Sequence, residues 1–275
     1  MTTDQPQVPV PKEALDWLRA KGVKPGFDHR DVFQEEHATI FTVAKAMKLD
    51  ILEAIRAAVD EMVLDGQDFN TFRRELQPLL VKQGWWGKAD MLDPLTGQTR
   101  EVQLGSPRRL RVIYDTNLRT ANAAGQWDRI QRTKKTQPFL LYQLGPSRHH
   151  RAEHLGWAGI LLPADDPFWQ THFPPNGWGC KCWVRQVSRR EAERLQVSGK
   201  YITEAPTGKL LEFINQRTGQ VLQVPEGIEP GWAYNPGAVP RLKQAEQLLE
   251  EKEKTSTVLA KPKRPQKSRR RDDQE

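Results

Sequence analysis

The chain has 275 residues, a net charge of +7 and only two cysteines, and its polar N-terminus lacks the apolar core of a signal peptide. No apolar run approaches the ~18 residues of a membrane-spanning helix, so we expect a soluble protein made in a reducing cytoplasm, long enough for one large domain or two small ones. Positive charge is concentrated: residues 105–154 hold 10 Lys and Arg against 3 Asp and Glu, and residues 261–275 hold 7 against 3.

The first third of the chain predicts helices. Residues 1–11 are polar and contain three prolines, which indicates disorder, whereas residues 12–104 have the pattern of a helical N-terminal region. A short helix is expected from Glu13 to Lys21. Apolar residues that recur every three or four positions predict a longer helical stretch from Val32 to Leu64, broken near Lys48–Asp50.

A further helix and a turn complete this region. The apolar spacing predicts a helix from Phe69 to Lys82, which Pro78 should kink or divide because proline cannot donate the helical hydrogen bond. Asp93–Gly97 has the composition of a turn, and we expect Arg100–Leu104 to return from it as a strand.

Ser106 and Pro107 are typical of a helix N-cap and first turn, and the helix that they open should extend to about Thr133. Gly125 weakens its middle. The outer face of this helix is basic, and it is either a solvated surface or a phosphate-binding one. The candidates for nucleic-acid contact on it are Arg108, Arg109, Arg111 and Arg119.

Short apolar runs between turns dominate after Pro138 and predict strands. We expect strands and a hairpin at residues 139–144, 159–162, 183–187, 210–214 and 221–224, and a capped helix at 189–196. The fold class is therefore predicted to be α+β, with a compact mixed core over residues 105–240.

The C-terminal end predicts a charged helix over residues 241–260 and a disordered basic tail over residues 261–275, too poor in apolar residues to offset its ordering entropy. Such tails bind DNA or RNA through counterion release, although many only aid solubility. The tail residues assigned to nucleic-acid contact are Lys263, Arg264, Arg269, Arg270 and Arg271.

One stretch, residues 148–184, holds both cysteines and four of the six histidines. Cys180 and Cys182 form a C-x-C pair whose side chains share one face of an extended segment. With His154 and His172 they make two thiolates and two imidazoles, a tetrahedral set suited to zinc, although the spacing differs from the usual C-x2-C knuckles. The alternative is free or buried thiols and hydrogen-bonded histidines.

The same stretch contains a longer ordered motif. Its residues are Arg151, His154, Asp165, Asp166, Pro167, Phe168, Trp169, Pro174, Pro175, Gly177, Cys180 and Cys182. This motif resembles that of the Mu F-like phage head morphogenesis proteins, although Lys181 stands where the family has arginine. The resemblance extends to Phe41–Leu52, Gly84–Gly87 and Gly231–Gly237, so it covers roughly residues 30–240.

The resemblance implies a non-enzymatic minor head protein of a phage or prophage. Such a protein would be made in the host bacterial cytoplasm, would be incorporated into the virion, and would contact the portal, other capsid proteins and packaged double-stranded DNA. An alternative is a metal-dependent nuclease or hydrolase that uses His149, His150, His154, Asp165 and Asp166. No phosphate-binding loop of a packaging motor is present.

Overall fold

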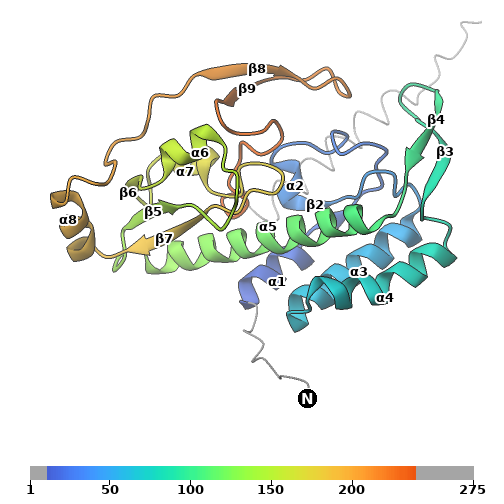
Figure 1. Cartoon of the computed structure of the whole chain (residues 1–275), viewed down its shortest axis with the longest axis horizontal. Coiled ribbons are helices and arrows are strands. Elements are labelled where there is room, and N and C mark those ends of the chain that lie inside the picture. Colours follow the sequence, from blue (N-terminus) through green and yellow to red (C-terminus); the bar gives the residue numbers. More distant parts are fainter. Residues whose placement is uncertain (1–10, 240–275) are drawn as a thin grey trace, which may run out of the picture. The chain divides into compact units, whose positions relative to one another are not determined.

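Figure 1 shows the computed structural model of the chain, in which residues 11–239 are described. These residues belong to one compact unit, which ends at Arg241. Residues 1–10, the expected C-terminal helix at 241–260 and the basic tail at 261–275 lie outside the described residues. Within 11–239, none of the helices has the length and apolarity that crossing a bilayer requires.

Three helices build the N-terminal part: α1 (Lys12–Arg19), α3 (Leu49–Asp65) and α4 (Phe69–Lys82). Gly66 ends α3 with φ 63°, a left-handed conformation that costs glycine little. The Asp68 side chain caps α4 by accepting from the backbone amides of residues 70 and 71. The expected division of α4 at Pro78 does not occur, since the helix continues through that residue.

The prediction of a helix that begins at Val32 is wrong for most of the segment before α3. That segment contains only α2 (Glu36–Thr39) and β2 (Ile40–Phe41), and β2 pairs in parallel with β1 (Gly22–Val23). Lys45 has φ 69°, which a right-handed helix cannot contain. The apolar residues of this segment are buried as a folded loop rather than as a helical face.

The long helix α5 (Pro107–Thr133) connects two hydrophobic clusters. Its residues Leu110, Ile113, Ala121 and Ala124 belong to the cluster that includes α1, α3 and α4, whereas Trp127 and Ile130 belong to the core of the following sheet. Gly125 does not interrupt the helix. A Cβ at this position would lie 2.8 Å from the backbone nitrogen of Ala14, so glycine here allows α1 to approach closely.

The core sheet is antiparallel in the order β6 (Leu161–Pro163), β5 (Phe139–Gln143), β7 (Trp183–Val187). Alternation along β5 places Leu140 and Tyr142 in the cluster shared with α5, and Leu141 in a second cluster with α8 (Arg189–Val197). Two short helices, α6 (Ala152–Trp157) and α7 (Phe168–His172), lie in the loops between these strands. The sheet and the N-terminal helices together confirm the predicted α+β class.

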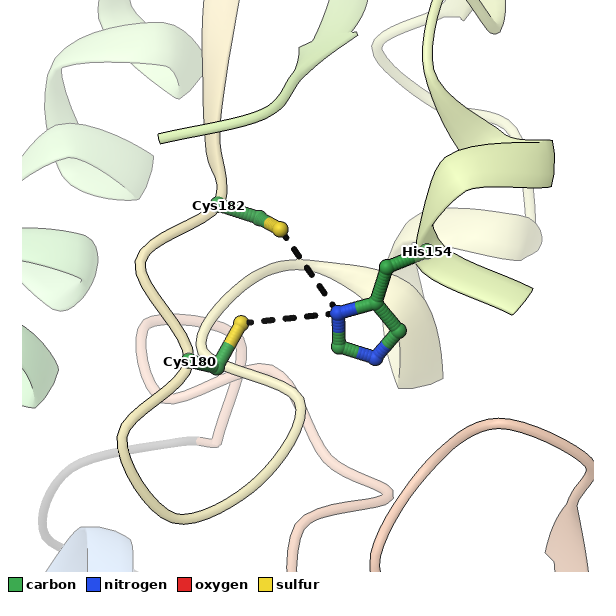
Figure 2. Close-up of side chains that lie close together, drawn as sticks. All are labelled: His154, Cys180 and Cys182. Atoms are coloured by element: carbon green, nitrogen blue, oxygen red, sulfur yellow. Dashed lines mark hydrogen bonds between the residues drawn. The ribbon is translucent and has the colours of Figure 1, made fainter. Parts of the chain in front are cut away.

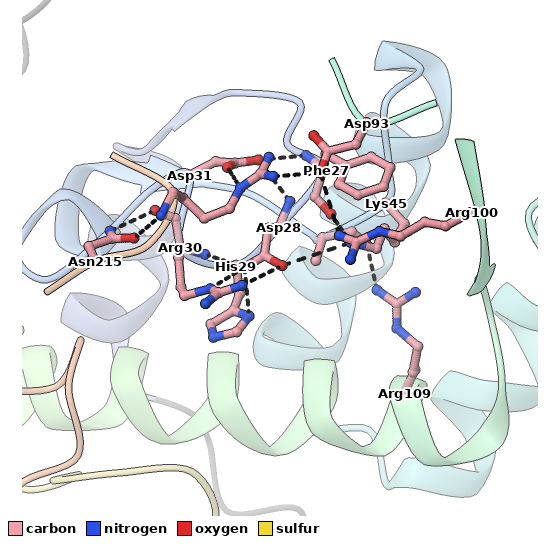
Figure 3. Close-up of polar contacts among 12 residues, drawn as sticks. Phe27, Asp28, His29, Arg30, Asp31, Lys45, Asp93, Arg100, Arg109 and Asn215 are labelled. Carbon is pink, nitrogen blue, oxygen red and sulfur yellow. Dashed lines mark hydrogen bonds and ion pairs between the residues drawn. The ribbon is translucent and has the colours of Figure 1, made fainter. Parts of the chain in front are cut away.

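Two hairpins, β3–β4 (Lys88–Leu92, Thr99–Gln103) and β8–β9 (Leu210–Ile214, Val221–Pro225), confirm the expected turns. Their turns meet at the loop after β1, as Figure 3 shows. Arg217 of one turn, whose side chain is 7% exposed, pairs with Asp93 of the other at 2.6 Å and with Asp31 of the loop at 2.7 Å. A mostly buried arginine therefore joins three segments that are distant in sequence.

Candidate metal centre

Three side chains from two parts of the central stretch meet in the interior. His154 projects from α6, and the two cysteines lie in the loop that leads into β7 (Figure 2). His154 and Cys180 are buried, and Cys182 is partly buried. The strand pairing of β7 with β5 fixes the end of this loop, because Trp183, directly after Cys182, pairs with Gln143.

The three ligand atoms are close enough to share one ion. Both sulfurs face the same ring nitrogen: His154 Nδ1 is 3.8 Å from Cys180 Sγ and 3.6 Å from Cys182 Sγ. The three atoms all lie within 4.8 Å of one another. Two sulfurs and one imidazole nitrogen are ligands that zinc prefers.

The opposite ring nitrogen of His154 fixes the orientation of the imidazole. His154 Nε2 lies 3.0 Å from the carbonyl oxygen of Gly227. A carbonyl only accepts hydrogen bonds, so Nε2 carries the proton and Nδ1 presents its lone pair to the sulfurs. Gly227 has φ 87° and a Cβ there would lie 2.4 Å from Glu153, so only glycine suits this position.

The two thiols differ in acidity. The hydrogen bond with Cys180 lowers the pKa of Cys182 to about 6, and the backbone amide of Gly145 and the charge of Arg151 contribute to this shift. The same contact and burial raise the pKa of Cys180. One thiolate is therefore favoured near neutral pH, and it is the form that binds metals.

His172, the fourth residue expected in the zinc set, is not part of it. Its Nδ1 hydrogen-bonds with Thr171 Oγ1 at 2.8 Å, and its ring stacks on Phe168. Trp157 contacts the rings of both histidines. Burial lowers the pKa of His172 to about 4, so the ring is neutral and packed among aromatic side chains.

The other motif residues hold the loops together. Arg151 pairs with Glu229, whose second oxygen accepts from the Trp178 amide at 2.7 Å. A Cβ on Gly177 would lie 2.8 Å from the Glu229 carboxyl group. The carboxylate thus links Arg151 to Trp178, and glycine at position 177 leaves room for it.

The Asp-Asp-Pro-Phe-Trp segment is also structural. Asp166 accepts from the Phe168 amide at 2.9 Å and so stabilises the turn that leads into α7. Within α7, Trp169 is fully buried and donates to the carbonyl of Pro163. Asp165 is exposed and pairs with Lys134. Neither carboxylate joins the cysteine and histidine set.

The arginines expected on the outer face of α5 are mostly engaged. Arg109 donates to the carbonyls of residues 44, 103 and 104, so its placement on an outer face is a wrong expectation. Arg119 donates to the Cys180 carbonyl at 2.7 Å, and Arg111 lies over the Phe69 ring. Of the four, Arg108 is exposed and has no side-chain partner among residues 11–239.

Sequence reasoning missed the groups that surround the centre. Tyr142 donates to Asn176, and both are buried beside the cysteines. At Gly145 an added Cβ would lie 1.8 Å from the Lys181 carbonyl oxygen, so this glycine lets the C-x-C loop pass. The only signal in the sequence is the Gly-Pro turn after β5.

Comparisons with known proteins show which family the sequence resembles. Residues 53–185 match the family model described as Phage Mu protein F like protein. The chain is 37% identical over 242 residues to a protein named "Putative capsid assembly protein F" of Escherichia phage Mu, an alignment that covers 83% of this chain and 54% of that protein.

A second relative, named "Mu-like prophage FluMu F protein", from Haemophilus influenzae, is 35% identical over 221 residues, covering 74% of this chain and 51% of the relative. The chain thus spans about half the length of these relatives. No solved structure matches the chain. The motif and the relatives agree, and the chain belongs to the family of phage Mu protein F like proteins.

Proposed function

We propose that this chain is a minor head protein that acts in phage head and capsid assembly. The observation that carries the proposal is its 37% identity, over 83% of the chain, to the protein named for capsid assembly in phage Mu. By this proposal the protein is made in the host bacterial cytoplasm and is incorporated into the virion. Its partners are the portal and other capsid proteins.

Contact with packaged DNA is the second part of the proposal. Support comes from charge: residues 105–154 and 261–275 together hold 17 of the 42 basic residues and only 6 of the 35 acidic ones. Within the helix α5, the exposed Arg108 is the best placed of the four candidate arginines. The tail supplies the remaining candidates by sequence alone.

The proposal also holds that the protein assembles without catalysing a reaction. The motif residues Arg151, Asp166 and Trp169 are used in internal hydrogen bonds that shape the loops. The two carboxylates that the alternative nuclease or hydrolase would use are also engaged elsewhere, because Asp165 pairs with Lys134 and Asp166 accepts from the Phe168 amide.

The test uses a phage or inducible prophage that carries the gene. Deleting the gene should abolish DNA-filled heads in electron micrographs of lysates, while tails still form, and the wild-type gene supplied in trans should restore the heads. Mass spectrometry of purified virions should detect the protein. DNA-filled heads in normal number from the deletion strain would overturn the assembly role.

A further inference from the structure

We propose that one zinc ion is bound by His154 Nδ1, Cys180 Sγ and Cys182 Sγ, with water in the fourth position. This inference concerns the chain's own ligands and stands independently of the proposed role in head assembly. It differs from the set expected from the sequence because His172 is excluded and an open position remains.

The distances match a coordination polyhedron. Bonds of about 2.3 Å to sulfur and about 2.05 Å to nitrogen at a tetrahedral angle put a nitrogen and a sulfur ligand about 3.6 Å apart. The two nitrogen–sulfur distances here are 3.6 and 3.8 Å. The side chains therefore already stand close to where a shared zinc requires them.

Hydrogen bonds alone explain the convergence of these three side chains less well than a shared metal ion does. His154 Nδ1 has one lone pair, because its other ring nitrogen donates to Gly227. One thiol can use that lone pair, whereas both sulfurs point at it (Figure 2). A cation at the meeting point satisfies both sulfurs at once.

The surroundings are those of a metal ligand shell. Metal-binding histidines typically donate their second ring N–H to a backbone carbonyl, as His154 does to Gly227. This contact orients the imidazole so that Nδ1 points at both sulfurs.

A surface cleft gives water a route to the cysteine side of the cluster. It has a volume of about 440 Å³ and is lined by both cysteines together with Arg119 and Arg129 of α5. Within residues 11–239, no fourth His, Cys, Asp or Glu completes the set. A water molecule entering by this cleft completes a four-coordinate site.

The experiment measures bound metal in the full-length chain purified without chelators. Wild-type protein should carry about one zinc per chain, and His154→Gln, Cys180→Ser and Cys182→Ser should each reduce the zinc to background. His172→Gln is the matched control, because it alters a histidine of the same motif outside the ligand set, and it should keep the zinc. Circular dichroism of each variant shows whether it is folded.

Cobalt substitution of the wild-type protein keeps the proposal testable if the variants unfold. Co²⁺ should give the visible bands of a tetrahedral site and near-ultraviolet sulfur-to-metal charge transfer, and a small added anion such as cyanide should shift the visible bands. Bands that cyanide leaves unchanged would overturn the open position. Wild-type protein that binds neither zinc nor cobalt, or a His154→Gln variant that retains zinc, would overturn the site.

Discussion

At the scale of single residues, chemistry follows from what surrounds a side chain rather than from its type. His154 and His172 belong to the same motif, yet one presents a lone pair to two sulfurs and the other packs between aromatic rings. Sequence spacing cannot separate these roles, because both histidines lie within loop reach of the cysteines. Only the direction of α6 and α7 distinguishes them.

A pH dependence of stability is expected at His37. This residue lines a cavity of about 310 Å³ beside Lys21, and burial with the nearby ammonium group lowers its pKa to about 4. The unfolded chain, in which the histidine pKa is near 6.5, binds more protons than the folded chain between pH 6.5 and 4. His37 should therefore contribute stability fully above pH 6.5 and lose it as the pH falls towards 4.

Replacing His37 with glutamine removes this titration. The free energy of unfolding of wild-type protein should fall relative to His37→Gln by on the order of 2 kcal/mol between pH 6.5 and 4. Urea titrations at several pH values measure the difference, with the exposed His149→Gln as the control. Parallel pH profiles for wild type and His37→Gln would refute the assignment.

At the scale of elements, the distance to a neighbouring element decides whether a glycine in a helix can be replaced by alanine. Gly125 of α5 lies against Ala14 of α1, where an added Cβ would meet the backbone nitrogen at 2.8 Å. At Gly156 of α6, an added Cβ would point into open space, with no packed neighbour within 4 Å. The two glycines have the same low helix propensity but opposite packing, which allows a paired test.

Gly125→Ala and Gly156→Ala should shift stability in opposite directions. Alanine gains up to about 1 kcal/mol in helix propensity at either site, but at Gly125 overpacking against α1 costs about 1–3 kcal/mol. Thermal and urea denaturation should thus show a destabilised Gly125→Ala and a Gly156→Ala that is unchanged or more stable. A more stable Gly125→Ala would mean that α1 does not pack as described.

Elements with strong local signals were predictable, whereas those set by tertiary contacts were not. The caps at Ser106 and Ser188 and the turns of both hairpins have local chemistry that the sequence displays, and these elements agree with expectation. The stretch before α3 has helical spacing, yet its apolar residues fill a folded loop in which Lys45 has a positive φ. Spacing alone cannot tell such a loop from a helix.

The candidate metal centre also contains some residues that the sequence predicted and others that it did not. The C-x-C pair and His154 were identifiable by residue type, and the structure brings these three together. The contributions of Gly145, Gly227 and Glu229 could not be predicted, because each of these residues acts through a contact with a residue that is distant in sequence. Residue type thus predicts ligands, whereas the groups that orient them require the fold.

At the scale of the whole molecule, the charge distribution separates a folded part with paired charges from a basic end. In α5, Arg129 and Arg132 pair with Glu13, and Arg119 binds a carbonyl, so much of the positive charge at residues 105–154 is already used. Residues 261–275 hold 7 Lys and Arg against 3 acidic residues. Any nonspecific affinity for DNA should therefore depend strongly on that end.

Truncation after Ala260 tests this dependence without removing any residue of 11–239. Each phosphate that is neutralised releases counterions, and about six contacts would lower affinity by on the order of a thousandfold as salt rises from 50 to 200 mM. Titration of duplex DNA should show weaker binding and a smaller salt slope for the truncated chain than for the full chain. In the full chain, Arg108→Gln should also weaken DNA binding. Arg109→Gln should instead lower mainly the stability of the fold, because the guanidinium group of Arg109 already donates to three carbonyls. Equal affinities and equal salt slopes for both chains would exclude residues 261–275 from DNA binding and leave protein contacts as the basis of the proposed place of this protein in the head.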